Sequence, residues 1–179
     1  MLIHDKNFVP FLSQAAIQTR IDEVCTALAK TYSQTDAPPL FVAILNGSFM
    51  LAADVMRRMP MACEIAFIKL QSYSGTASTG KVTTAIGLEA EKVRGRDVIL
   101  LEDIVDTGNT LASFLPTLAA MQPRSRCIFT LLLKPEALQQ PDLPLDYIGF
   151  EVENKFLIGY GLDYDGLGRQ YMDIYQLES

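Results

Sequence analysis

The sequence predicts an α/β fold with a Rossmann-like parallel sheet at its core and helices on both faces of that sheet. Three short apolar runs, at residues 40–45, 98–101 and 127–133, and a further strand candidate at residues 63–70 alternate with helical patterns. Their spacing of about 30 residues is typical of right-handed βαβ units. The run at residues 40–45, LFVAIL, is continuously apolar, as expected of a parallel strand that is buried on both faces.

Length and composition predict one compact domain, residues 1–179. At about 150 residues per domain, a chain of 179 residues leaves little over. Apolar residues make up 49 % of the chain and charged residues 20 %, which excludes general disorder. The net charge of −6 argues against a broad nucleic-acid surface. No apolar run approaches the ~20 residues that span a bilayer, so we expect neither nucleic acid nor membrane as a partner.

The single histidine and the scattered cysteines exclude several kinds of site. His4 lies near the chain end, and a Ser-His-Asp or His-Cys arrangement would depend on it. Cys25, Cys63 and Cys127 lie far apart in apolar stretches, and this spacing predicts no zinc site. Reduced core cysteines and a leading segment without the apolar stretch of a signal peptide predict a cytoplasmic protein. Catalysis is therefore expected from carboxylates, Lys, Arg, Tyr or backbone groups.

Three helical patterns accompany the predicted strands, one before the first strand and two between strands. Apolar residues recur at helical spacing over residues 13–30, and Ser13 is placed to be the N-cap. A second helix is expected at residues 49–59, after an Asn-Gly-Ser turn. The third pattern, residues 108–121, contains Pro116, which predicts a kink or an early break there.

The remaining segments are less regular. Residues 71–84 are long, small and polar, and we expect a mobile loop because few apolar side chains hold it closed. Residues 82–88 are expected to pair as an antiparallel hairpin. Two shorter strands are expected at residues 147–152 and 156–160, after a proline-rich stretch.

The segment VILLEDIVDTGNTL, residues 98–111, carries the strongest chemical indication. Glu102 and Asp103 directly follow a buried apolar run, and unpaired charge there is costly unless it faces a cleft, a cation or hydroxyl donors. Residues 106–110, DTGNT, then open a helix whose free N–H groups and threonine hydroxyls form an anion site. A phosphate cradle beside a carboxylate pair suited to ribose or Mg²⁺ indicates a nucleotide or a phosphorylated pentose. The alternative is an ordinary helix cap after a solvated strand end.

This segment resembles the phosphoribosyl pyrophosphate signature of type I phosphoribosyltransferases. Further motifs narrow the resemblance to the hypoxanthine-guanine phosphoribosyltransferase family. They are LNGS at residues 45–48, Ser72-Tyr73, LLLKP at 131–135 and GFEVENKFLIGYGLDYDGLGR at 149–169. The motifs stand in the family's order and cover most of the chain. The resemblance implies a small hood, built from the chain ends, beside the parallel sheet.

The resemblance also implies a reaction in purine salvage. Ribose 5-phosphate would pass from phosphoribosyl pyrophosphate to N9 of hypoxanthine, or of guanine, giving IMP or GMP and pyrophosphate. Mg²⁺ is the implied cofactor, and a homo-oligomer, dimer or tetramer, is the implied assembly. Two alternatives are a xanthine-guanine phosphoribosyltransferase and an RNA-binding regulator of pyrimidine operons with uracil phosphoribosyltransferase activity. Asp106 argues against the regulator, which commonly has a non-acidic residue there, and so does the absence of a Lys/Arg cluster.

Site roles follow from the resemblance. Asp106 is the implied general acid/base at the purine imidazole ring, and Ser72 and Tyr73 would help exclude water from the reacting centre. The implied substrate contacts are Leu45, Asn46, Gly47, Ser48 and Arg169 for pyrophosphate, Glu102 and Asp103 for the ribose hydroxyls, Thr107, Gly108, Asn109 and Thr110 for the 5′-phosphate, and Lys134, Phe156 and Leu157 for the base. The implied metal ligands are Glu102, Asp103 and Asp163. The sequence departs from the family at Asn46, where many members carry a basic residue.

Overall fold

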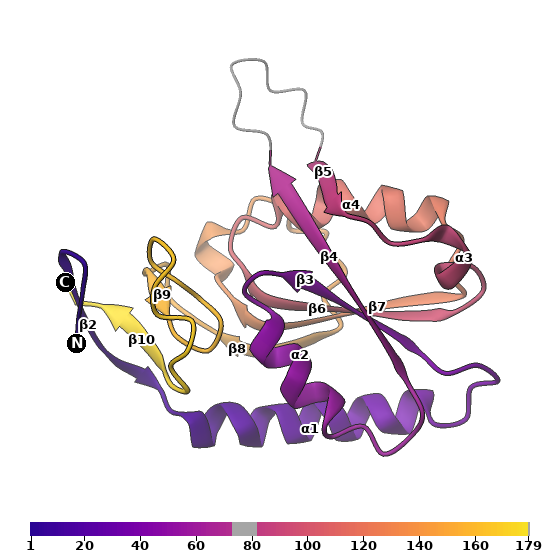
Figure 1. The fold of residues 1–179 in the computed structure, drawn as a ribbon, viewed down its shortest axis with the longest axis horizontal. Coiled ribbons are helices and arrows are strands. Elements are labelled where there is room, and N and C mark those ends of the chain that lie inside the picture. The colour runs from indigo at the N-terminus through magenta and orange to yellow at the C-terminus, as the bar shows by residue number, and fades with distance from the viewer. Residues whose placement is uncertain (73–81, 179) are drawn as a thin grey trace.

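A computed structural model describes residues 1–72 and 82–178 (Figure 1). Its main element is a six-stranded sheet in the order β5-β4-β3-β6-β7-β8. All neighbouring strands are parallel except β5, which runs antiparallel to β4. The predicted parallel sheet and the predicted hairpin are therefore confirmed. The strands are β3 (Leu40–Leu45), β4 (Glu64–Ser72), β5 (Val82–Ile86), β6 (Asp97–Val105), β7 (Ser125–Leu133) and β8 (Tyr147–Glu151).

Helices cover both faces of the sheet because every buried strand has two apolar faces. Phe41 and Ala43 of β3 pack in one core cluster with α1 (Gln14–Tyr32) and α2 (Phe49–Met56). The alternate residues Leu40 and Val42 pack in the opposite cluster with α3 (Ala90–Val93) and α4 (Asn109–Ala120). A short 3-10 helix, η1 (Pro135–Ala137), follows β7.

Two helix predictions have different outcomes. α1 begins after Ser13, whose Oγ accepts a hydrogen bond from the Ala16 N–H at 3.3 Å, so the predicted N-cap is confirmed. The early break expected at Pro116 is wrong, because α4 continues through it to Ala120. Pro116 lies on the exposed face of α4, where water can hydrate the carbonyl that lost its N–H partner.

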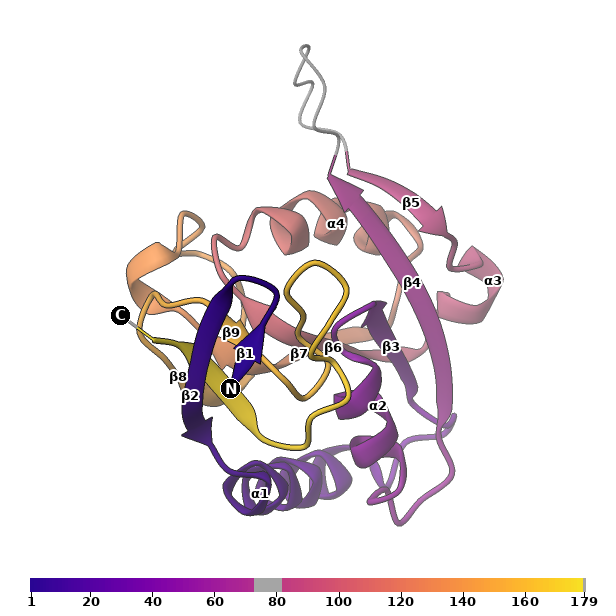
Figure 2. The same ribbon diagram turned by 60° about the vertical axis from the view of Figure 1, so that its left-hand side comes forward.

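The chain ends form the expected hood, a second sheet in the order β1-β2-β10-β9. Its strands are β1 (Leu2–Ile3), β2 (Lys6–Leu12), β9 (Leu157–Ile158) and β10 (Ile174–Leu177), all antiparallel to their neighbours. Figure 2 shows β2 and β10, from opposite ends of the chain, side by side. The strand expected at residues 156–160 is shorter in the structure, because the backbone turns at Gly159, where φ is 94°.

The order of the strands creates a crevice at the carboxyl ends of β3 and β6, the two middle strands of the sheet. β3 lies between β4 and β6, so the connections that leave β3 and β6 run in opposite directions across the sheet. In open α/β sheets, ligands bind beyond the carboxyl ends of two such strands. The loops at this position are residues 45–48 after β3 and residues 106–108 after β6.

The remaining expectations concern cysteines and membranes. Cys25 and Cys127 are buried, Cys63 is partly buried, and all three are free. Within the described part of the chain, no helix combines the length and the apolar character needed to cross a bilayer.

Candidate active site

Strand β6 carries two acids into the crevice. Glu102 is 9 % exposed, and its Oε2 has no hydrogen-bond partner among the described residues. Burial raises the pKa of Glu102 well above its usual range, and the neighbouring charge of Asp103 raises it further. Burial also raises the pKa of Asp103, to about 6. Among the described residues, Glu102 Oε2 therefore lacks a donor that would stabilise its charge, whereas backbone N–H groups and the Arg169 guanidinium offset only part of the effect of burial on Asp103.

The loop after β3 lies directly against Asp103. A Cβ atom added at Gly47 would overlap the Asp103 carboxylate, so any larger residue here would displace that carboxylate. The Leu45–Asn46 peptide bond in the same loop is cis. Ser48 is buried, and its hydroxyl donates a hydrogen bond to the Ile44 carbonyl at 2.6 Å, so its side chain points into the fold. The Ser48 side chain is therefore engaged within the fold and does not face the pocket.

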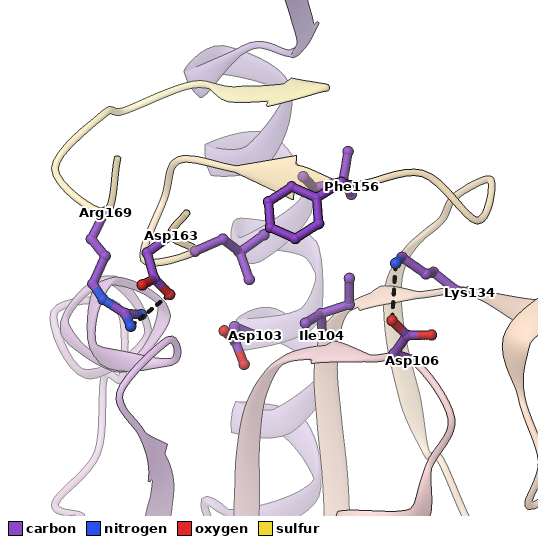
Figure 3. A pocket seen from close by; sticks show the side chains of 9 residues that line it. Asp103, Ile104, Asp106, Lys134, Phe156, Asp163 and Arg169 are labelled. Carbon is purple, nitrogen blue, oxygen red and sulfur yellow. Dashed lines mark hydrogen bonds and ion pairs between the residues drawn. The ribbon is translucent and has the colours of Figure 1, made fainter. Parts of the chain in front are cut away.

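Asp106, directly after β6, and Lys134, directly after the neighbouring strand β7, form an ion pair. Lys134 Nζ, at the end of β7, lies 3.0 Å from Asp106 Oδ2 (Figure 3). The lysine side chain is 8 % exposed, whereas the aspartate side chain is 48 % exposed. The Lys134 N–H also donates to the Val105 carbonyl at 3.0 Å. A nearly buried ammonium group with three N–H donors keeps two of them for a ligand after it has paired with one carboxylate.

These side chains line a pocket of about 190 Å³ between the sheet and the hood. Phe156, which is 43 % exposed, faces Ile104 across it (Figure 3). The ring therefore offers a flat apolar surface on which a planar ligand can stack. The lining residues are Asp103, Ile104, Asp106, Lys134, Phe156, Leu157, Leu162, Asp163 and Arg169.

A second hollow, of about 90 Å³, adjoins the pocket at the N-terminus of α4 and shares Ile104 and Asp106 with it. Gly108 opens the helix with φ 79°, a left-handed conformation that favours glycine. The hollow is lined by Glu102, Ile104, Val105, Asp106, Thr107, Gly108, Thr110 and Leu111. Because free N–H groups and the positive end of the helix dipole meet here, the hollow suits an anion.

Asn109 is not among the residues that line this hollow. Its side-chain amide donates to Gln139 Oε1 at 2.9 Å and accepts from Gln140 Nε2 at 2.8 Å. Its N–H donates to Thr107 Oγ1 at 3.3 Å. Of the four residues expected around the phosphate, Thr107, Gly108 and Thr110 lie together, and the Asn109 side chain points elsewhere.

Asp163 and Arg169 close the opposite end of the pocket. Arg169 Nη2 lies 2.6 Å from Asp163 Oδ1, and Nη1 donates to the Gly161 carbonyl at 2.7 Å. The Gly166 N–H donates to Asp163 Oδ2 at 2.8 Å. A guanidinium beside Asp103 and the 45–48 loop provides a positive group suited to paired phosphate oxygens.

The structure does not describe every expected site residue. Ser72 is the last residue of β4, and only its backbone is described. Tyr73 lies outside the described residues. Sequence reasoning missed Ile104 and Leu162 as pocket walls, because apolar residues inside the motifs look like ordinary core.

The acids fit Mg²⁺ bound together with a substrate. Among the described residues, no group of three or more His, Cys, Asp or Glu side chains converges on one point. Mg²⁺ commonly binds through one or two carboxylates, with substrate phosphates and waters completing its shell. The unpartnered Oε2 of Glu102 and the partly buried Asp103 supply oxygens of this kind.

Comparison with known proteins identifies the class. The family model described as phosphoribosyl transferase domain matches residues 13–165, so the chain belongs to the phosphoribosyltransferase family. Hypoxanthine phosphoribosyltransferase of Salmonella typhimurium is 36 % identical over 154 residues, which cover 86 % of this chain and 85 % of the relative. Hypoxanthine-guanine phosphoribosyltransferase of Mycobacterium avium is 35 % identical over 168 residues, 91 % of this chain and 80 % of the relative.

Solved structures agree with the fold. A hypoxanthine phosphoribosyltransferase of Staphylococcus aureus superposes with a TM-score of 0.85 at 34 % identity, covering 95 % of this chain and 91 % of that one. The enzyme of Trypanosoma cruzi gives a TM-score of 0.88 at 30 % identity, with 99 % and 95 % covered. The hooded α/β architecture is therefore the type I phosphoribosyltransferase fold.

Proposed function

We propose that the protein transfers ribose 5-phosphate from phosphoribosyl pyrophosphate to N9 of hypoxanthine and of guanine, as a purine salvage enzyme. The observation that carries this proposal is the position of Asp106, on the wall shared by the pocket that Phe156 lines and the hollow at the N-terminus of α4. A base in the pocket and a 5′-phosphate in the hollow leave the ribose between them, beside Glu102 and Asp103. The names of the relatives support the same substrates.

The N-terminus of α4 would hold the 5′-phosphate. Thr107, Gly108 and Thr110 line the hollow there, and backbone N–H groups at a helix N-terminus bind phosphate without needing a lysine. The ribose hydroxyls would donate to Glu102 and Asp103. Such donors favour the ionised carboxylates and so offset the rise in their pKa values that burial causes.

The base would stack between Phe156 and Ile104, with the Leu157 backbone at the ring edge. Lys134 Nζ would donate a hydrogen bond to the 6-oxo group of hypoxanthine or guanine. An adenine would bring its 6-amino donor to the same ammonium, and two donors repel one another. The pocket therefore favours 6-oxopurines over adenine.

Proton transfer falls to Asp106. As purine N9 bonds to ribose C1 and the bond to pyrophosphate breaks, Asp106 accepts the proton of the imidazole ring. The Lys134 ammonium, 3.0 Å from Asp106 Oδ2, fixes the position of this carboxylate beside the base. Mg²⁺, held by one or two of the carboxylates of Glu102, Asp103 and Asp163 together with substrate oxygens, would neutralise charge on the leaving pyrophosphate. The fold's own contribution is otherwise positioning and electrostatics.

Arg169 and the backbone of residues 45–48 would bind the pyrophosphate. Asn46 brings no positive charge to this loop, so Arg169 becomes the cationic side chain proposed for that end of the site. Ser72 and Tyr73 would cover the reacting centre, which protects the sugar cation from water. Their role stays a prediction.

Location and assembly complete the proposal. We place the reaction in the cytoplasm, where the three free cysteines stay reduced. We also propose a dimer or tetramer. Phe49 of α2 and Phe67 of β4 are 40 % and 42 % exposed, and a second copy would cover such large apolar side chains. Light scattering of the purified protein tests the assembly.

An absorbance assay tests the function. Phosphoribosyl pyrophosphate and Mg²⁺ are mixed with hypoxanthine, guanine, xanthine, adenine or uracil in separate reactions. We expect turnover of hypoxanthine and guanine that requires Mg²⁺, and none of adenine. Xanthine belongs in the panel because a relative from Tritrichomonas foetus, 37 % identical over 152 residues, is named for all three 6-oxopurines. Turnover of uracil alone would overturn the proposal and favour the pyrimidine-operon regulator.

A further inference from the structure

Asp54 is a buried acid that lies outside the pocket. It is 4 % exposed, although it belongs to the apolar helix α2. Its carboxylate accepts hydrogen bonds from Gln18 Nε2 of α1 at 2.6 Å and from the Tyr160 hydroxyl at 2.5 Å, and it pairs with the Arg57 guanidinium. Burial alone would raise the pKa of Asp54, but these donors hold it below its usual value. The carboxylate thus ties α1, α2 and the turn after β9 together.

Tyr160 holds an uncommon backbone conformation for a large residue. It is 1 % exposed, and its φ of 48° lies between Gly159 at 94° and Gly161 at 100°. A tyrosine in the left-handed region is strained and persists only where its surroundings hold it. Here the ring is buried in the core cluster, the hydroxyl bonds to Asp54, and the N–H donates to the Tyr171 carbonyl at 2.8 Å.

Gly161 connects Tyr160 to the pyrophosphate end of the site. A Cβ atom at Gly161 would collide with the Gly47 carbonyl oxygen, so the two backbones are in close contact. The Gly161 carbonyl also accepts from Arg169 Nη1 at 2.7 Å. Helix α2, which carries Asp54, begins directly after the 45–48 loop. Loop and turn are therefore joined twice, by this backbone contact and by the bond from Asp54 to Tyr160.

We propose that Asp54 and Tyr160 are positioning residues for the pyrophosphate group of phosphoribosyl pyrophosphate, an inference that rests on the proposed function. Their hydrogen bond fixes the separation between the 45–48 loop and the turn that leads to Asp163 and Arg169. Lys134 is held instead by β7 and Asp106, and Phe156 and Leu157 are held by the pairing of β9 with β10, so the base end of the pocket keeps its geometry when the bond is removed.

The test uses Tyr160→Phe, which removes only the hydroxyl, in steady-state assays that vary each substrate separately. Because small misplacements of binding groups are costly, we expect the KM for phosphoribosyl pyrophosphate and the inhibition constant of pyrophosphate to rise about tenfold. The KM for hypoxanthine should stay unchanged. Asp54→Asn, which keeps the shape but not the charge, should shift the same two constants. In the double variant these two constants should rise no further than in the more affected single variant, because the two substitutions remove the same hydrogen bond.

Tyr32→Phe is the matched control. Tyr32 is the last residue of α1, belongs to the same core cluster as Tyr160, and is also nearly buried. Loss of the Tyr32 hydroxyl should lower the thermal unfolding midpoint and leave the KM values for both substrates unchanged. A stability effect is thereby separated from a positioning effect.

Three results would overturn the proposal: a folded Tyr160→Phe protein with both pyrophosphate-end constants unchanged, an equal rise in both KM values, or the same shift in Tyr32→Phe. If Tyr160→Phe does not fold, Asp54→Asn decides by the same constants. A wild-type protein that turns over no 6-oxopurine would refute the proposed function instead. Calorimetry with pyrophosphate and Mg²⁺ would then decide the positioning role, since Tyr160→Phe must bind pyrophosphate more weakly than wild type does.

Discussion

Replacing Asp103 by asparagine is expected to stabilise the ligand-free protein at neutral pH while weakening its binding of phosphoribosyl pyrophosphate. Asp103 lies in the crevice, and its burial, which the Arg169 guanidinium offsets only in part, raises its pKa to about 6. Asparagine keeps the shape and a carbonyl oxygen for the local backbone N–H donors but carries no charge. Stability and binding should therefore change in opposite directions.

The magnitude follows from linkage. A pKa of about 6 in place of the ordinary 3.8, at 1.36 kcal/mol per pKa unit, corresponds to about 3 kcal/mol. Because the folded protein holds this proton more tightly than the unfolded chain does, stability is greatest below pH 3.8. It falls as the pH rises through about 6. The gain from Asp103→Asn should therefore approach about 3 kcal/mol at pH 8 and vanish in acid.

Urea unfolding with EDTA present, at several pH values, measures this difference. Asp97, at the opposite end of the same strand, is the matched control: it is more fully buried than Asp103, but it pairs with Arg124 and accepts from Ser125 Oγ at 2.6 Å. These partners, Arg124 foremost, lower its pKa, so its stabilisation is lost as the pH falls. Asp97→Asn should cost about 2 kcal/mol at pH 8. An Asp103→Asn protein no more stable than wild type at pH 8 would refute the reasoning.

The other predictions concern the proposed reaction. Asp106→Asn should lower kcat by about 10²–10⁴ with little change in the KM for phosphoribosyl pyrophosphate, and a large rise in that KM at unchanged kcat would contradict its role as base. Lys134→Met should raise the KM for hypoxanthine by about 10–100-fold, because a charged hydrogen bond is lost; equal KM values in variant and wild type would place the 6-oxo group elsewhere. Gly47→Ala should weaken calorimetric binding of phosphoribosyl pyrophosphate at least about tenfold, since its Cβ would overlap Asp103; wild-type affinity would show that the loop can move aside.

Local pattern predicted the parallel strands of the central sheet, most directly β3, because a strand buried on both faces reads as a continuous apolar run. The end of β6 shows where that reasoning stops. The apolar run ends at Leu101, yet the strand continues to Val105, because backbone pairing to β7 persists at Glu102 and Ile104 whatever their side chains. Strand length was set by the neighbouring strand, which a local pattern does not contain.

The hood and the site differ in the same way. No periodicity marked β2 as a strand, since it is set by pairing with β10 at the other end of the chain, and the hood was expected only from the family resemblance. The acids and the phosphate turn were predictable because they are contiguous in sequence. The contact from Asp54 to Tyr160 joins residues 106 positions apart, and it was missed although a lone acid in an apolar helix was visible.

The central claim is that the shared wall at Asp106 brings together a purine and a phosphoribosyl group. Its most direct test is to incubate the purified protein with phosphoribosyl pyrophosphate, hypoxanthine and Mg²⁺ and to quantify both products by chromatography. We expect IMP and pyrophosphate in equal amounts, with neither formed by Asp106→Asn on the same timescale. Tight binding of phosphoribosyl pyrophosphate by wild type without either product would contradict the account.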